Sequence, residues 1–232
     1  MWDMLNTSAF WVALGQIIIV NIMLSGDNAV VIALASRSLP PQQQRSAIIF
    51  GSVGAIVLRV ILTFFAVMLL QIPYLKLAGG LALLWIGTGL LSSEGDDEGP
   101  DAHSNLWAAI RTIIVADLIM SLDNVLGVAA AAKGNTVLLV LGLVISIPLI
   151  IYGSKMILSL MGRFPIIITL GAALLGWVAG EMMVDDSSVS GWINTNANFL
   201  HHATPVVCAV GVVVVGRWMD ARHRRAQPAV AA

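Results

Sequence analysis

Long runs of apolar residues, interrupted by short polar breaks, make up most of the chain up to about residue 219. A helix needs about 20 mostly apolar residues to cross a bilayer. By that measure the pattern predicts seven spans, at 8–36, 46–72, 74–92, 106–132, 135–161, 164–184 and 203–219. Proline, glycine and charged residues gather in the connections between these spans. We therefore expect an all-α polytopic membrane protein with seven transmembrane helices.

The composition of the 232-residue chain supports this expectation. Hydrophobic residues make up 58% of the chain and charged residues only 11%, whereas soluble domains carry about 25% charged residues. The formal net charge of −1 gives no electrostatic basis for binding nucleic acid. The single cysteine, Cys208, has no partner for an internal disulfide, and we interpret it as a packing residue. An ordinary soluble enzyme is excluded.

The distribution of basic residues predicts the orientation of the spans. If the C-terminus is cytoplasmic, the outer side holds only Lys76 and Lys133. The cytoplasmic side then holds eight arginines: Arg37, Arg45, Arg111, Arg163, Arg217, Arg222, Arg224 and Arg225. An excess of basic residues on the cytoplasmic side is the usual arrangement. We expect the N-terminus outside and the C-terminus inside, and the first span, which starts Met-Trp-Asp without a basic region, is not expected to be a cleaved signal peptide.

Two halves of the sequence resemble each other. The segment 21–28 (NIMLSGDN) aligns with 117–124 (DLIMSLDN) at an offset of 96, and Pro73 aligns with Pro165 at an offset of 92. Each unit contains three spans, and an odd number of spans makes the second unit enter the membrane from the opposite side. Inverted repeats of this kind are characteristic of secondary transporters, whose sites lie near the membrane midplane between the repeats.

The repeat divides the chain into five segments. These are a first three-helix repeat at 1–93, an acidic cytoplasmic linker at 94–105, a second, inverted three-helix repeat at 106–184, an external loop at 185–202, and a seventh helix with a basic cytoplasmic tail at 203–232. We interpret the acidic linker as a solvated tether.

Six ionisable residues fall at membrane depth: Asp27, Arg59, Asp117, Asp123, Lys155 and Glu181. Each costs about 2.5–3.5 kcal/mol to insert at the centre of a span, so such residues usually face the interior of a bundle and have a functional role. For three of them a second interpretation stays open. Lys155 and Glu181 can extend toward an interface along their apolar stems, and Arg59 can simply neutralise a neighbouring acid.

Asp27 and Asp123 occupy equivalent places in the two repeats, and each is followed by an asparagine. Carboxylate and amide oxygens are hard ligands that suit Mg²⁺, Ca²⁺ or Mn²⁺. In a regular helix Asn21, Ser25 and Asn28 share one face, as do Asp117, Ser121 and Asn124. The aspartates of the doublets point about 100° away from these faces. Both faces therefore need protein or water around them, so the doublets lie on central helices or the helix is unwound at the doublet. Gly26 permits unwinding in the first copy, whereas Leu122 does not favour it in the second.

Inversion of the second repeat also exchanges depths. Asp27 is expected to share a layer with Asp117, and Asn21 a layer with Asp123. Two oxygen-rich layers, one nearer each side of the membrane, could bind the transported ion in turn during alternating access.

The Ser-Gly-Asp-Asn and Ser-Leu-Asp-Asn doublets, the run Gly-Ala-Ala-Leu-Leu-Gly-Trp at 171–177 and the following Gly180-Glu181 resemble those of the TerC family of integral membrane proteins. The resemblance covers roughly residues 8–184. It implies a manganese exporter of the bacterial inner membrane. Carried over to this chain, it points to a metal site formed by Asp27, Asn28, Asp117, Asp123 and Asn124. Residues expected to support that site or couple it to protons are Asn21, Ser25, Ser121, Arg59, Lys155 and Glu181.

The leading hypothesis is a secondary transporter that exports divalent cations, above all Mn²⁺, in exchange for protons. The chain has no Gly-x-x-x-x-Gly-Lys-Ser/Thr motif, so it is not expected to use ATP by itself. Two alternatives stay open: an exporter of another small cation or an amino acid, and an intramembrane aspartyl protease with two carboxylates sharing a proton. We expect no enzymatic activity and no permanently bound cofactor.

The expected partners are the transported ion and the lipid bilayer, with no nucleic acid. A homo-oligomer or other membrane-protein partners stay open. His201 and His202, near the outer end of the seventh span, are interpreted as an interfacial pair.

The orientation can be tested with topology reporters. A reporter fused after Arg225 is expected to read as cytoplasmic, and one inserted at 187–200 as external, because eight of the ten assigned basic residues favour that orientation. Both reporters reading from the same side would contradict the seven-span prediction and, with it, the inversion of the second repeat.

Overall fold

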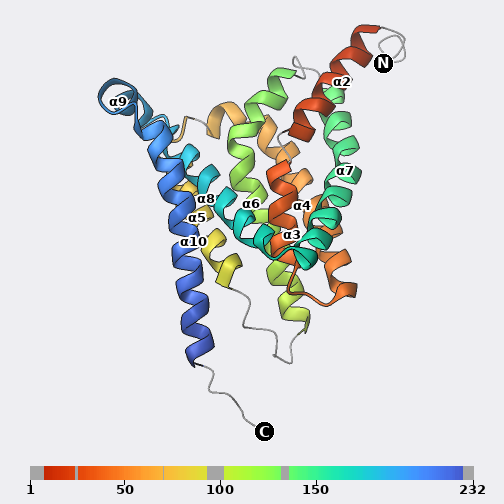
Figure 1. Ribbon diagram of the computed structural model, residues 1–232. Coiled ribbons are helices and arrows are strands. Elements are labelled where there is room, and N and C mark those ends of the chain that lie inside the picture. Colours follow the sequence, from red (N-terminus) through yellow and green to blue (C-terminus); the bar gives the residue numbers. More distant parts are fainter. Residues whose placement is uncertain (1–7, 24–25, 70, 93–101, 132–135, 227–232) are drawn as a thin grey trace.

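The computed structural model describes residues 8–23, 26–69, 71–92, 102–131 and 136–226. Every regular element in these ranges is a helix (Figure 1). The helices are α2 (Ser8–Met23), α3 (Gly26–Ser36), α4 (Pro41–Leu69), α5 (Leu75–Ser92), α6 (Ala102–Ala131), α7 (Thr136–Arg163), α8 (Ile166–Val184), α9 (Ser190–Asn196) and α10 (Leu200–Ala226). Among the described residues, five helices are long and apolar enough to cross a membrane: α4, α5, α7, α8 and α10. These helices indicate a multi-pass membrane protein.

The helices follow the sequence pattern with two differences. The span predicted at 8–36 contains two helices, since α2 ends at Met23 and α3 begins at Gly26. Its counterpart α6 is continuous across Leu122. The polar stretch predicted as an external loop contains the short helix α9. Helix α4 starts with Pro41 at its first position, where the missing proline N–H costs no hydrogen bond.

The directions of the helices alternate along the chain. In Figure 1 the chain descends through α2 and α3, ascends through α4, descends through α5 and ascends through α6. It then descends through α7, ascends through α8 and descends through α10. The start of α2 and the end of α10 therefore lie at opposite ends of the bundle, while α3 and α6 run in opposite directions.

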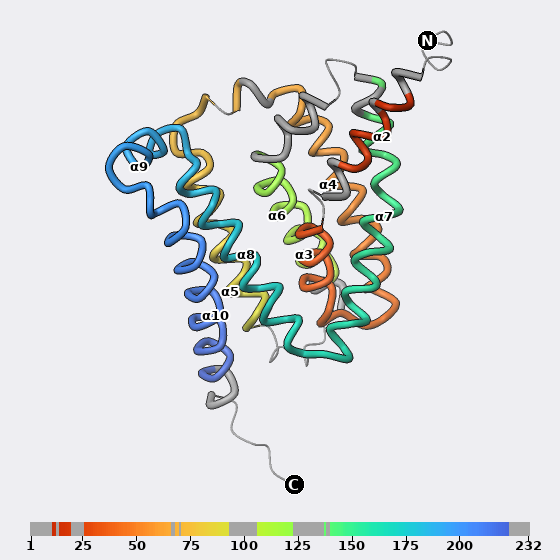
Figure 2. The backbone as a smooth tube through the Cα atoms, turned by 45° about the horizontal axis from the view of Figure 1, so that its top comes forward, coloured from red at the N-terminus to blue at the C-terminus, as the bar shows by residue number. Residues whose placement is uncertain are grey.

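Helices α3 and α6 occupy the centre of the bundle (Figure 2). One apolar cluster joins buried residues of α2, α3, α4, α6 and α7, including Ile32 and Ile113. A second cluster joins α3, α5, α6, α7 and α8, including Leu34 and Met120. Because α3 and α6 supply buried residues to both clusters, their surfaces are covered by protein on more than one side.

The remaining helices pack in a definite set of pairs. Helix α4 packs mainly against α6, and α7 packs against both α2 and α3. Helices α5, α8 and α10 form a third group. Gly176 and Gly180 bring α8 and α10 together: an added Cβ would lie 2.6 Å from the Cys208 carbonyl oxygen at Gly176 and 2.5 Å from Pro205 Cα at Gly180. Small residues that allow backbones to approach closely are typical of helix contacts within membranes.

Large apolar side chains cover much of the outer surface of the bundle. Trp11, Trp107 and Trp218 are exposed near helix ends, and Trp192 is exposed in α9. Tryptophan is enriched where a membrane protein meets the lipid–water interface. Exposed apolar surface with tryptophans near the helix ends agrees with a bundle that faces lipid.

One buried carboxylate, Asp186, joins the end of α8 to the start of α5. Its side chain is 1% exposed and accepts hydrogen bonds from the backbone N–H groups of Lys76 at 3.0 Å and Leu77 at 3.2 Å, in the first turn of α5. It also accepts one from Tyr74 N–H at 3.2 Å. Tyr74 has a φ of 62°, a left-handed conformation that costs free energy in a residue other than glycine. Asp186 therefore caps α5 from a distant part of the chain and holds a strained turn.

The same hydrogen bonds govern the ionisation of Asp186. Burial acts to raise the pKa of this carboxyl group, but the hydrogen bonds from the backbone amides of Ser188, Leu77 and Tyr74 outweigh burial and leave the pKa below its ordinary value. A carboxyl group whose pKa is lower in the folded than in the unfolded chain stabilises the fold above its ordinary pKa. That contribution is lost as the pH falls through the lowered pKa.

Asp186→Asn is expected to lower the free energy of unfolding by about 1–2 kcal/mol, the usual scale for losing a helix cap. Thermal unfolding of the purified protein in detergent measures this loss. The wild type should also lose more stability than the variant when the pH falls from about 5 to about 3, because only the wild type has the carboxylate to protonate. The matched control is Asp185→Asn at the exposed neighbouring position, and an equal loss in both variants would contradict the capping role.

Candidate ion site

Among the side chains that the structure describes, Arg59 is the largest that is almost completely buried, at 2% exposed. It lies on α4 on the side that faces α6. Its Nη2 donates to Asp117 Oδ1 at 2.6 Å, and its Nε donates to Ser121 Oγ at 2.9 Å. Ser121 Oγ in turn donates to Asp117 Oδ2 at 3.2 Å. These three residues form a closed buried network between two helices.

The packing of α4 against α6 brings this network together. Gly51 and Gly54 face Ile113 and Ile114, and an added Cβ at either glycine would lie less than 3 Å from the facing isoleucine. Residue numbers rise together along the two helices, which therefore run in the same direction. Arg59 then lies beyond Gly54 on the face that meets Asp117. Glycines thus allow the close approach that lets the guanidinium reach the carboxylate.

Asp27 and Asn28 lie in the first turn of α3, beside this network. Asp27 is partly buried, and its Oδ1 accepts a hydrogen bond from the Asn28 backbone N–H at 3.0 Å. The Asn28 side chain is 1% exposed. Asp27 interacts electrostatically with both Arg59 and Asp117. The structure therefore brings together two carboxylates from α3 and α6 and one guanidinium from α4.

This group of charges is unbalanced. Two carboxylates face one guanidinium, so the formal charge of Asp27, Arg59 and Asp117 together is negative when all three are ionised. Asp27 lies in the first turn of α3, at the positive end of that helix's dipole. A further cation near these oxygens would compensate the excess negative charge.

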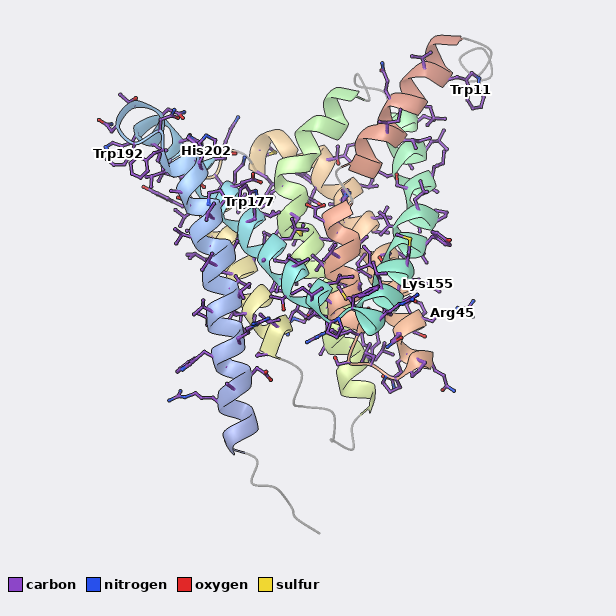
Figure 3. The ribbon with its side chains drawn as sticks, in the orientation of Figure 1. Trp11, Arg45, Lys155, Trp177, Trp192 and His202 are labelled. Atoms are coloured by element: carbon purple, nitrogen blue, oxygen red, sulfur yellow. The ribbon has the colours of Figure 1, made fainter. Side chains whose placement is uncertain are left out.

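The structure does not place every candidate residue in this region. Lys155 is exposed on α7 and lies toward the same end of the bundle as Arg45 (Figure 3). Glu181 is exposed on α8 and accepts a hydrogen bond from Trp177 Nε1 at 2.8 Å. Both have the surroundings of residues near an interface. His201 contacts Asn194 Oδ1 at 2.7 Å and Asp185 Oδ1 at 3.6 Å, while His202 is exposed.

Four candidate residues lie outside the described part of the chain or have side chains outside it: Asn21, Ser25, Asp123 and Asn124. The acidic residues of the linker at 94–101 also lie outside it. Within the described residues, no three His, Cys, Asp or Glu side chains form a group that could hold a metal ion. Asp27 and Asp117 alone therefore do not make up such a group in this part of the chain.

Comparison with known proteins gives the family. The pattern of the integral membrane protein TerC family matches residues 6–224. The chain belongs to the TerC family. It is 46% identical over 181 residues to the uncharacterized membrane protein YjbE of Bacillus subtilis, covering 78% of this chain and 83% of the relative. It is 26% identical over 197 residues to the UPF0053 inner membrane protein YgdQ of Escherichia coli, covering 77% and 83%. No solved structure matches this TerC-family chain.

Sequence reasoning did not single out Asp186, the cap of α5 in this TerC-family fold. An acid directly after a span has no distinctive pattern of its own. Its role depends on α5 and α8 lying antiparallel as neighbours, which places the end of one helix beside the start of the other. By contrast, membrane depth made Arg59 and Asp117 candidates, and Ser121 became one because it shares a helix face with Asp117.

The buried pair in this TerC-family protein predicts strong energetic coupling. Asp117→Asn leaves the Arg59 charge buried without its counter-charge, and a loss of one partner from a buried pair costs about 3–5 kcal/mol. Arg59→Gln is expected to cost a similar amount. The double variant should lose clearly less than the sum, because neither charge remains. Thermal unfolding in detergent measures all three, with Arg45→Gln on the exposed part of α4 as the control; additive losses would contradict the coupling.

Proposed function

We propose that this TerC-family protein exports divalent cations, above all Mn²⁺, from the cytoplasm by proton-coupled alternating access. The observation that carries the proposal is the convergence of Asp27 and Asp117 beside a single buried guanidinium in the centre of an apolar bundle. Carboxylates in such a place are costly and mark ion or proton pathways. Oxygen ligands without thiolate or imidazole suit a hard divalent ion such as Mn²⁺.

The arrangement of the helices supports two inverted repeats, with α2–α5 as the first and α6–α8 as the second. If the two repeats are exchanged, α6 takes the place of α2 and α3 together, α7 takes the place of α4, and α8 takes the place of α5. The observed contacts agree with this exchange, since α4 packs against α6 just as α7 packs against α2 and α3. The contact between α5 and α8 is unchanged, because the exchange only swaps its two members. Helices α3 and α6 also run in opposite directions (Figure 1). A site between inverted repeats is typical of secondary transporters.

The position of the first doublet in the first turn of α3 also supports transport. Secondary transporters commonly place a helix end at the substrate site, so that backbone groups as well as side chains contact the ion. Here Asp27 and Asn28 lie at the start of α3. We assign Asp27, Asn28 and Asp117 to the ion site, together with Asp123 and Asn124 of the second doublet. We place the protein in the inner membrane, the location that the name of its relative YgdQ gives for that protein. The basic residues favour an N-terminus outside.

The decisive test is the removal of single negative charges. Asp27→Asn and Asp123→Asn are each expected to abolish Mn²⁺ export at normal protein abundance, because each change is nearly isosteric and removes only the charge that attracts the ion in a low-dielectric site. Asn28→Ala and Asn124→Ala should be milder, since water can replace a neutral ligand. The measurement is Mn²⁺ transport into proteoliposomes and Mn²⁺ content of cells that express each variant.

Asp185→Asn, which removes an exposed charge outside the spans, is the matched control and should transport normally. Normal Mn²⁺ export by both Asp27→Asn and Asp123→Asn would refute the proposed ion site. Transport of another cation by the wild type, with no Mn²⁺ transport, would retain the site and change the substrate.

A further inference from the structure

Arg59 is bound to one of the two carboxylates that the proposed function assigns to the ion. The ion and the guanidinium therefore compete for Asp117. Both are cations, and neither can reach the full set of carboxylate oxygens while the other is in place. A role limited to packing does not explain why the largest almost fully buried side chain is a charged one that donates directly to this carboxylate.

The two repeats differ at this point. At the offset of 96 that aligns the doublets, Asp117 corresponds to Asn21 and Arg59 corresponds to Lys155. Arg59 is buried against Asp117, whereas Lys155 is exposed at the surface of α7. The extra carboxylate, on α6 of the second repeat, is thus paired with a buried cation on α4 of the first repeat. This correspondence links the guanidinium to Asp117 rather than to the general packing of the helix.

We propose, on the basis of the proposed function, that Arg59 is a tethered counter-ion that occupies Asp117 when no transported cation is present and sets a charge threshold for displacing it. A divalent ion attracts the carboxylate twice as strongly as a single charge at the same distance. A monovalent ion has only the charge that Arg59 already supplies, and it lacks the guanidinium hydrogen bond. Arg59 therefore excludes monovalent cations from the site.

The guanidinium has a second point of attachment besides Asp117. Arg59 binds Asp117 through Nη2 and Ser121 through Nε, so the two bonds use different nitrogens. When a divalent ion takes the carboxylate, the bond from Nε to Ser121 Oγ can persist while Nη2 turns away. The side chain stays attached to α6 and returns to Asp117 after the ion leaves.

The test is Mn²⁺ transport by purified protein in proteoliposomes, with Na⁺ replaced by a large organic cation at constant ionic strength. Arg59→Gln removes the competitor, and the KM for Mn²⁺ is expected to fall about tenfold, equivalent to about 1.4 kcal/mol. Na⁺ should inhibit this variant and leave the wild type unaffected. Arg59→Lys keeps the charge but loses the fork of donors, so its KM should lie between those of Arg59→Gln and the wild type. Arg45→Gln makes the same change at an exposed position of α4 and should match the wild type.

Each result decides a different point. A lower maximal rate with unchanged KM and no effect of Na⁺, in both Arg59 variants, would overturn the counter-ion role and leave the proposed function intact. Absence of Mn²⁺ transport by the wild type would overturn the proposed function and this inference with it. If Arg59→Gln does not insert, Arg59→Lys alone decides: a lowered KM supports the role, and an unchanged or raised KM overturns it.

Discussion

The burial of Asp117 and its pairing with Arg59 is the constraint on which the centre of this bundle depends. A carboxylate between apolar helices is stable only when a charged partner and further hydrogen bonds compensate it. Arg59 and Ser121 supply both, but only because Gly51 and Gly54 allow α4 to approach α6 closely. The pair and the glycines therefore depend on one another. Loss of Arg59 or Asp117 leaves the other charge buried alone, and a larger residue at Gly51 or Gly54 would push the two helices apart.

A second group of contacts fixes the opposite side of the bundle. Helices α5, α8 and α10 meet through glycines, and Asp186 ties the start of α5 to the end of α8. Helices α3 and α6 lie between this group and the pairs formed by α2, α4 and α7, and they contribute to both apolar clusters. A movement of one side relative to the other must therefore also shift α3 or α6, the helices that carry Asp27 and Asp117.

The sequence predicted an all-helical, multi-pass membrane protein correctly, because lipid imposes a simple rule on spanning helices: about 20 apolar residues with satisfied backbone groups. The count of seven spans in two inverted repeats stays a prediction. Helix ends were less predictable, since α4 and α10 continue beyond their apolar spans into polar sequence. For the candidate site, membrane depth alone identified Asp27, Arg59 and Asp117. It did not distinguish these from Lys155 and Glu181, because depth along a helix is readable from sequence whereas the side that faces a neighbouring helix depends on the packing of the whole bundle.

The two copies of the Asp-Asn doublet lie on different kinds of backbone. The first copy stands at the start of α3, where Asp27 accepts a backbone hydrogen bond and the helix dipole favours negative charge. The second copy lies inside the continuous helix α6, whose interior backbone groups are committed to the helix. Repeats with equal side chains can therefore offer unequal binding, since only the first copy combines a carboxylate with a helix end. Together with the pairing of Arg59 with Asp117, this makes the two copies of the doublet unequal in the helices that carry them.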